Sequence, residues 1–256
     1  MRLRAFRRAV ALALSLAACV VDYWLTRIRG PLSLERRAHW LHRSCCRVSE
    51  AFGIRVTVCG RIPSHSLVVS NHLSHLDILI IGAVTPCFFV AKTEIASWPY
   101  FGRAARTGAT IFIDRKSRVS TVEVARLISE RLTLPVPVLL FPEGTSTDGS
   151  GVLRFHSSLF QPAVAASAPV TAAAIRYMLR GGESERDLCW FDDALFLPHL
   201  WKALGVSSFG AAVTFGEPRV YADRRTAAEA THEEVVAMRA EGTPSAVSSQ
   251  LSVLSP

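Results

Sequence analysis

The stretch Ser66-Leu67-Val68-Val69-Ser70-Asn71-His72-Leu73-Ser74-His75-Leu76-Asp77 joins a short apolar run to a helical pattern of apolar residues that begins at Ile78. A short apolar run bounded by polar residues is typical of a buried strand, and the apolar spacing after it is typical of a helix. We therefore expect a strand, a polar turn and a helix in direct succession.

His72 and Asp77 are five residues apart, and on one continuous helix their side chains would point about 140° apart. They can meet only if the helix begins between them. Ser74 followed three residues later by an acidic residue is typical of a capping box, with Ser74 at the N-cap and Asp77 at the third helical position. We expect His72 in the turn before the helix, where the Asp77 carboxylate can reach back to its ring.

A carboxylate bound to one imidazole nitrogen fixes the tautomer and leaves the other nitrogen free to take a proton from a hydroxyl. His72 and Asp77 are thus the predicted catalytic pair. On spacing alone, Asp77 could also merely stabilise a helix start, or His72, His75 and Asp77 could bind a metal ion. No metal site is expected, because no further ligand at a metal-binding spacing accompanies these residues.

Along the remaining chain, short β-rich runs alternate with helical patterns. The alternation indicates an α/β fold, a mostly parallel or mixed sheet flanked by helices, in which chemistry gathers in the loops beyond the strand ends. The expected strands are 55–59, 66–70, 87–91, 110–113, 136–141, 170–177 and 211–215, and the expected helices are 78–83, 100–107, 119–132, 159–166 and 226–240.

Other strand ends carry residues suited to binding a substrate. Glu143 and Gly144 follow one expected strand, Arg115 follows another, and Lys92 closes a third. Arginine can clamp an anion with two parallel hydrogen bonds, and glycine lets a ligand approach the backbone closely. Taken alone, each residue also fits an ordinary turn or a solvated surface.

The formal net charge of +8 on this 256-residue chain comes entirely from its N-terminal segment. Residues 1–47 contain ten arginines and two acidic residues, whereas the remaining nineteen basic residues are balanced by nineteen acidic ones. The same segment holds an apolar run over residues 9–25 that ends in aromatic residues. This combination favours an anionic membrane surface. Nucleic acid is not an expected partner, because no basic groove with interleaved aromatic residues accompanies the charge.

The apolar run is shorter than the ~20 residues that cross a bilayer comfortably, and Asp22 makes crossing costlier. We expect a helix that dips into the membrane, followed by a second amphipathic helix from about Ser33 to Phe52. A bacterial lipoprotein signal that ends before Cys19 is the rival interpretation. The apolar character continues beyond Cys19 instead of opening into a polar linker, which favours the anchor.

Four segments in this order resemble the motifs of the lysophosphatidic acid acyltransferase family, the bacterial 1-acylglycerol-3-phosphate acyltransferases. The similarity spans residues 66–177, and four ordered motifs are far more specific than one. In the fourth motif, alanine precedes Pro169 where the family often has valine. The four segments are Asn71-His72-Leu73-Ser74-His75-Leu76-Asp77, Thr110-Ile111-Phe112-Ile113-Asp114-Arg115, Phe141-Pro142-Glu143-Gly144-Thr145 and Ala168-Pro169-Val170, and Phe89-Val90-Ala91-Lys92 lies between the first two.

The resemblance implies transfer of a fatty acyl group from an acyl thioester to the free hydroxyl of 1-acylglycerol 3-phosphate, which gives phosphatidic acid in phospholipid synthesis. His72 would deprotonate the hydroxyl and Asp77 would orient His72, while His75 would be a packing or helix-surface residue. Asn71 and nearby loop amides are candidate donors to the tetrahedral oxyanion. Arg115 and Lys92 would hold the acceptor phosphate. The residues implied to position its glycerol end are Glu143, Gly144 and Thr145.

The resemblance implies no cofactor, because acyl carrier protein or coenzyme A carries the acyl group as a co-substrate. The expected partners are a membrane lysolipid and one of these thioesters. Because the thioester is made in the cytosol, we expect the protein at the cytoplasmic face of the bacterial inner membrane. The expected division is membrane-anchoring helices over 1–53, an acyltransferase α/β domain over 54–242 and a disordered tail over 243–256.

Three alternatives stay open. The motifs report the chemistry more than the headgroup, so the acceptor could be another lysolipid such as lyso-ornithine lipid. A membrane thioesterase would use water in place of the lipid hydroxyl, although the chain has no Gly-x-Ser-x-Gly elbow. A non-catalytic membrane-binding protein is the third alternative, and it leaves the polar residues at the strand ends unexplained.

Overall fold

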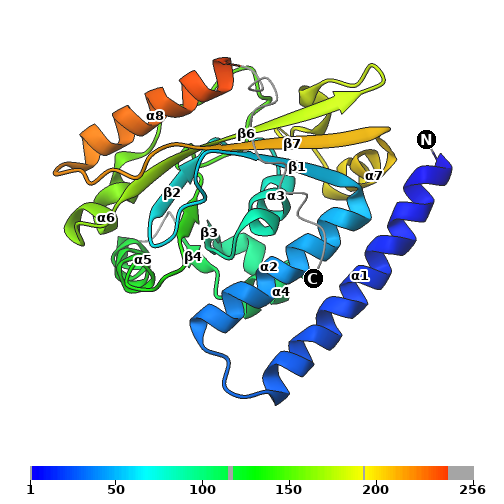
Figure 1. Ribbon diagram of the computed structural model, residues 1–256, viewed down its shortest axis with the longest axis horizontal. Helices are drawn as coiled ribbons and strands as arrows, with labels where there is room; N and C mark the ends of the chain where they lie inside the picture. The colour runs from blue at the N-terminus through cyan, green and yellow to red at the C-terminus, as the bar shows by residue number, and fades with distance from the viewer. Residues whose placement is uncertain (1, 115–117, 193, 242–256) are drawn as a thin grey trace.

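A seven-stranded sheet forms the centre of the computed structural model, which describes residues 2–114, 118–192 and 194–241 (Figure 1). The strand order is β1-β7-β6-β2-β5-β3-β4, and every neighbouring pair is parallel except β6 and β7. The predicted α/β class and all seven expected strands are confirmed. The strands are β1 (Ile54–Cys59), β2 (Leu67–Ser70), β3 (Phe88–Lys92), β4 (Ile111–Ile113), β5 (Val138–Leu140), β6 (Val170–Arg180) and β7 (Ser208–Phe215).

The helices include one that the sequence pattern did not predict, α7. Its Pro198 lies in the first turn, where a missing N–H costs no helical hydrogen bond. The helices are α1 (Arg2–Ile28), α2 (Leu34–Phe52), α3 (Leu76–Val84), α4 (Phe101–Thr107), α5 (Arg118–Arg131), α6 (Gln161–Ala165), α7 (Phe196–Gly205) and α8 (Arg224–Ala240), with short 3-10 turns η1 (Thr93–Ser97), η2 (Ser157–Phe160) and η3 (Glu185–Leu188).

Helices cover both faces of the sheet, and β2 is buried between them. Because side chains alternate along a strand, Val68 packs with the core residues of α2 and α3, whereas Leu67 and Val69 pack with those of α5 and α8. Figure 1 shows α8 above the sheet and α2 and α3 below it. The run 67–69 is apolar on both faces, which is typical of a strand in a parallel sheet.

The predicted N-terminal helical pair is present. α1 packs through a stripe of small and apolar residues at every seventh position, Ala5, Leu12, Cys19 and Thr26. α2 packs against α1, and most of the buried apolar residues of α2 belong to the same hydrophobic core as those of α3. The division of the chain into separate anchoring and catalytic parts stays a prediction.

The first turns of α1 are also tied to the end of α7. Arg8 donates to the carbonyl oxygens of Leu204 at 3.2 Å and Val206 at 2.8 Å, and Arg4 donates to that of Gly205 at 3.2 Å. Guanidinium groups at a helix C-terminus satisfy its free carbonyls and complement its dipole. These bonds join α1 to the α/β domain.

The topology brings the first and third motifs and the end of β3 to one edge of the sheet. β2, β5, β3 and β4 are parallel neighbours, so their carboxyl ends lie along the same edge. His72 follows β2, Glu143 follows β5, and Lys92 ends β3. The predicted tail and Arg115, two residues beyond β4, lie outside the described residues.

Candidate active site

The turn between β2 and α3 holds the predicted catalytic pair. α3 begins at Leu76 with His75 at its N-cap, one residue later than predicted. The predicted capping box is wrong in its serine half, because the Ser74 hydroxyl accepts from the amide of Leu76, at 3.3 Å, and not from that of Asp77. Its acidic half is present, since the Asp77 carboxylate accepts from the amide of Ser74 at 3.0 Å.

The predicted contact between His72 and Asp77 is confirmed. Nδ1 of His72 lies 2.8 Å from Oδ2 of Asp77, whose side chain is completely buried, whereas the His72 side chain is 19% exposed. The same carboxylate oxygen accepts from the amides of Leu73 at 2.7 Å and Ser74. The carboxylate therefore locks the turn as well as the imidazole ring.

The donors around Asp77 decide which nitrogen of His72 carries the proton. Both amides can only donate, and the buried Tyr177 hydroxyl donates to Oδ1 of Asp77. An ionised carboxylate can only accept, so Nδ1 of His72 must carry a hydrogen and donate it. Nε2 is left with its lone pair, and no described residue bonds to it. This is the tautomer that can accept a proton from a substrate hydroxyl.

The ring of His72 is also held by stacking. It lies against Phe141 with ring centroids 4.1 Å apart and planes inclined by 13°. Phe141 directly follows β5, so the first and third motifs touch through these two rings. Stacking on one side and Asp77 at Nδ1 leave the imidazole little freedom to rotate.

Glu143 binds the backbone of the catalytic turn. One carboxylate oxygen accepts from the amide of His72 and the other from the amide of Leu153, both at 2.7 Å. Thr147 adds a bond from its amide to the carbonyl of His72 at 2.9 Å. Burial raises the pKa of Glu143 to about 7, against the lowering effect of these two amide donors. Both Glu143 oxygens are thus engaged within the chain.

Three of the other predicted substrate-binding residues, Gly144, Thr145 and Lys92, lie within the described residues. Gly144 is buried and has a φ of 79°, a left-handed conformation that favours glycine. Thr145 and Lys92 are exposed and so are accessible to a substrate. Arg115 lies outside the described residues. The substrate-binding roles of all five residues, Glu143 included, stay predictions.

Asn71, a candidate oxyanion donor, is committed elsewhere. Its side-chain amide donates to the carbonyl of Ile175 at 3.2 Å, and its carbonyl accepts from the amide of the same residue at 2.8 Å. The side chain thereby extends the pairing of β2 with β6 beyond the last strand residue. Because it is buried and both ends are bonded, Asn71 is a structural residue, and the expectation that it contacts an oxyanion is wrong.

His75 is a packing residue, as predicted. Its ring lies 4.9–5.3 Å from those of His199, Phe196 and Trp190, and both its ring nitrogens are buried without a partner among the described residues. Burial lowers the pKa of His75 to about 3, so the ring is neutral. Within the described part of the chain, no group of three His, Cys, Asp or Glu side chains is placed to hold a metal ion.

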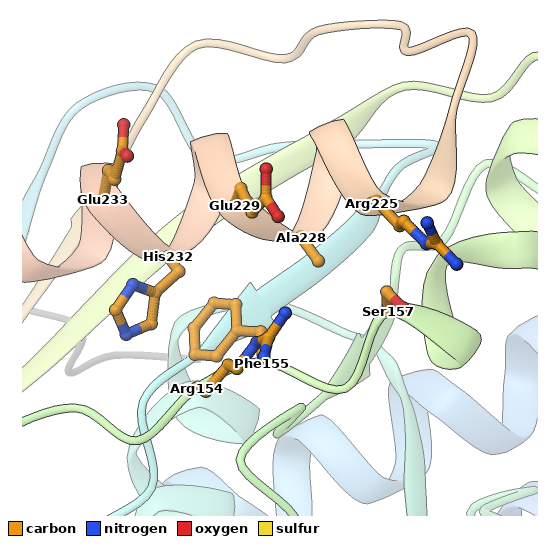
Figure 2. Close-up of a pocket in the computed structure, with 8 residues that line it drawn as sticks. All are labelled: Arg154, Phe155, Ser157, Arg225, Ala228, Glu229, His232 and Glu233. Carbon is orange, nitrogen blue, oxygen red and sulfur yellow. The ribbon is translucent and has the colours of Figure 1, made fainter.

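A separate cavity of about 300 Å³ lies between α8 and the segment 154–157 (Figure 2). Arg225 and Ser157 stand at one end of it, and His232 packs against Phe155 with ring centroids 5.2 Å apart. Its lining includes none of the predicted site residues that the structure describes. The catalytic turn is therefore distinct from this cavity.

Two residues of the site were missed by the sequence analysis. Tyr177 was placed in a strand without a role, and Phe141 was quoted only as the start of a motif. The period-2 pattern of β6 contained the one available signal, because Tyr177 shares a face with Ala173 and Ile175, the face that packs on α3. No local pattern showed that its hydroxyl meets Asp77, one hundred positions earlier.

The fold and this site together define an α/β enzyme with a His-Asp pair at the carboxyl edge of its sheet. The family model described as Acyltransferase matches residues 54–176. The lyso-ornithine lipid O-acyltransferase of Rhodobacter capsulatus is 37% identical over 229 residues, 82% of this chain and 80% of that protein. The 1-acyl-sn-glycerol-3-phosphate acyltransferase of Neisseria gonorrhoeae is 37% identical over 154 residues, 60% of each chain.

The fold is also that of a solved structure. The 1-acyl-sn-glycerophosphate acyltransferase PlsC from Thermotoga maritima superimposes with a TM-score of 0.64 at 20% sequence identity, over 93% of this chain and 97% of that one. With the close relatives above, the chain belongs to the lysophosphatidic acid acyltransferase family. It is an O-acyltransferase of lipid biosynthesis.

Proposed function

We propose that the protein transfers a fatty acyl group from an acyl thioester to the free hydroxyl of a membrane lysolipid, with His72 as the general base. The bond between His72 and the buried Asp77 carries this proposal, because it engages Nδ1 and leaves the lone pair of Nε2 to take a proton. Neither an acyl-enzyme nor a metal ion is needed for this chemistry.

The reaction balances with His72 alone as the proton carrier. Nε2 takes the proton from the lysolipid hydroxyl while the hydroxyl oxygen attacks the thioester carbonyl, and a tetrahedral intermediate forms. Collapse of this intermediate breaks the carbon–sulfur bond and expels the thiolate, which then takes the proton from the His72 imidazolium. Asp77 stabilises the imidazolium between these two steps.

We favour lyso-ornithine lipid as the preferred acceptor. The Rhodobacter relative aligns over 229 residues, well beyond the 54–176 segment that carries the motifs. The lyso-ornithine lipid O-acyltransferase of Brucella abortus likewise covers 82% of the chain. The alternative acceptor is 1-acylglycerol 3-phosphate, which the motifs imply and the Neisseria relative supports over 60% of the chain.

Substrate contacts are proposed for Lys92, Arg115, Gly144 and Thr145. Lys92 ends β3, and Gly144 and Thr145 follow β5, at the edge of the sheet where His72 lies. Glu143 would influence the acceptor indirectly, since its carboxylate already binds the amide of His72. The donor is acyl carrier protein or coenzyme A, which share the thioester that the mechanism requires.

The outer face of α1 supports docking at a membrane. It carries eight exposed apolar residues on the side of the helix opposite the buried stripe, at 100° per residue. α1 is long and apolar enough to cross a bilayer by composition. However, its buried side packs along α2, which contains charged residues, so lipid cannot surround it. The eight residues are Leu3, Phe6, Val10, Leu14, Val21, Trp24, Leu25 and Ile28.

We therefore propose that α1 lies in the interface with its outer face in the acyl chains, at the cytoplasmic side of the inner membrane, where the thioester is made. Cys19, where the rival lipoprotein signal would be cleaved, is buried against α2 in a continuous helix. Interfacial docking would let a lysolipid present its headgroup to the site while its tail stays in lipid.

The test is an acyl-transfer assay with the full-length protein in vesicles. Each vesicle preparation contains lyso-ornithine lipid, 1-acylglycerol 3-phosphate or no lysolipid, and receives a labelled acyl thioester of carrier protein or coenzyme A. We expect labelled diacyl product with a lysolipid, most rapidly with lyso-ornithine lipid, and none from the His72→Ala variant. Release of free fatty acid at the same rate without any lysolipid would instead identify a thioesterase and overturn the proposal.

A further inference from the structure

We propose that Tyr177 is a positioning residue for the transfer, whose hydroxyl keeps Asp77 ionised and oriented against His72. The inference rests on the proposed function, because it assigns a role in the proton transfer that His72 carries out. Tyr177 itself would touch neither substrate.

The two oxygens of Asp77 have different partners. Oδ2 accepts from the ring of His72 and from the amides of Leu73 and Ser74. Oδ1 accepts from the buried Tyr177 hydroxyl. The Asp77 side chain is completely buried, so no solvent could replace that donor. Without the hydroxyl, half of a buried carboxylate would be unsatisfied, which is costly in a dry environment.

The position of Tyr177 is itself closely held. Its amide donates to Oε1 of Glu185 at 2.8 Å, and Arg239 pairs with Oε2 of Glu185 at 2.8 Å. Arg239 also donates to the carbonyl of Ile175 at 2.5 Å. The ring packs edge-on against Phe209 with centroids 5.3 Å apart. A phenol fixed at its backbone and its ring presents its hydroxyl to Asp77 in one orientation.

The phenol remains a donor over the working pH range, because burial and then the Asp77 charge raise the pKa of Tyr177 well above its ordinary value. Other titratable groups also lie close enough to influence the His72, Asp77 and Tyr177 chain. These groups are Glu143 and His75 on the His72 side and Cys189 and Glu185 on the Tyr177 side, with Arg239 paired to Glu185.

Removing the hydroxyl should change the proton affinity of the pair in a known direction. Asp77 would lose a donor that stabilises its anion, so protonation of its carboxylate would become easier. Without the Tyr177 hydroxyl, less of the negative charge of Asp77 would be neutralised by a hydrogen bond. The protonated form of His72 would therefore be more stable than it is in wild type. Both effects move the acid limb of the pH profile of kcat/KM to higher pH.

The test compares Tyr177→Phe with wild type in the vesicle assay, together with an NMR titration of the His72 ring in detergent-solubilised protein. We expect kcat to fall about 10–100-fold, the range found for carboxylate partners that orient metal-binding histidines, by analogy. KM for both substrates should be unchanged, and the acid limb and the His72 titration should both move to higher pH. Wild-type kcat, or a lowered kcat with an unmoved acid limb, would overturn the inference.

Two further variants separate orientation from packing. Phe209→Leu loosens the ring contact but keeps the hydroxyl, so it should lower Tm and move the acid limb less than Tyr177→Phe does. An equal displacement in both variants would assign the effect to packing and overturn the inference. Site-specific 3-fluorotyrosine at position 177 keeps the shape and makes the hydroxyl a stronger donor, so it should move the acid limb to lower pH. If Tyr177→Phe does not fold, this second variant decides, and an unmoved limb refutes the role.

The NMR arm distinguishes the inference from the proposed function, because it requires no turnover. If wild type transfers no acyl group to any lysolipid, the proposed function fails. A His72 titration that moves in Tyr177→Phe would still establish the coupling between the two residues. If transfer occurs but neither the titration nor the profile moves, only the inference fails.

Discussion

One carboxylate oxygen of Glu143 lies 2.7 Å from the amide nitrogen of His72, and the other lies 2.7 Å from the amide nitrogen of Leu153. The carboxylate thus joins the catalytic turn, the loop after β5 and the segment that leads towards η2. Glu143 is 4% exposed, so solvent contributes little to satisfying these amides. The position of the proposed base thus depends on the Glu143 carboxylate.

The Glu143→Gln variant should show how the charge of this group affects stability. The pKa of Glu143 is raised to about 7 in the folded protein, from 4.5 for an unperturbed carboxyl group. The contribution of protonated Glu143 to the free energy of unfolding is complete below pH 4.5 and is lost as pH rises through 7. The free energy of unfolding of wild type, minus that of the variant, should fall over this interval by at most about 1.4 kcal/mol per pH unit.

Urea unfolding of both proteins at several pH values measures this difference. Glu233→Gln removes one charge from an exposed position of α8 and is the matched control. A difference between wild type and Glu143→Gln that grows with pH would show that the amide donors outweigh burial at Glu143.

His72→Ala should lower kcat by about 10²–10⁴-fold, the usual contribution of a general base. The circular dichroism spectrum and vesicle binding should be unchanged, because the His72 side chain is partly exposed and its backbone bonds remain possible. His39→Ala removes an exposed histidine of α2 and is the control, with wild-type turnover expected. Wild-type turnover in His72→Ala would eliminate the general-base role.

Asn71→Ala should destabilise the fold by roughly 1–3 kcal/mol, because it leaves the buried amide of Ile175 without its partner, whereas the carbonyl of Ile175 keeps the bond from Arg239. Ser70→Ala is a close control: its hydroxyl is buried one residue away and has no partner in the described structure. Thermal unfolding of both variants measures the effect. Equal Tm values for the two would mean that the Asn71 bonds contribute nothing to stability.

Replacing apolar residues on the outer face of α1 should weaken membrane binding without affecting the fold. Phe6 and Leu14 are 61% and 67% exposed, and transferring such a side chain into lipid contributes about 1.5–3 kcal/mol. Phe6→Ser and Leu14→Ser should each weaken binding to anionic vesicles about tenfold or more, as measured by flotation. Val122→Ser, at a residue of α5 that is 73% exposed, should bind like wild type. Equal binding by all three variants would contradict an interfacial α1.

Local patterns were enough to predict all seven strands and every α-helix except α7. Every expected strand is present because apolar runs such as 67–69 and 170–175 can be buried only in a sheet covered on both faces. The contact between His72 and Asp77 was also predictable, since it depends on where one helix begins. Even there the helix start differed by one residue, because the Ser74 hydroxyl accepts from Leu76 and not from Asp77.

Long-range contacts determined the roles of three buried polar residues. Asn71 pairs with Ile175, Glu143 binds the amide of His72, and Tyr177 donates to Asp77, and each contact joins residues at least 71 positions apart. A buried donor or acceptor must find a partner, but its own sequence neighbourhood does not specify which distant group will be within reach. The residue pattern therefore predicted the contact between His72 and Asp77, whereas the folded sheet alone selected the groups that hold these two residues in place.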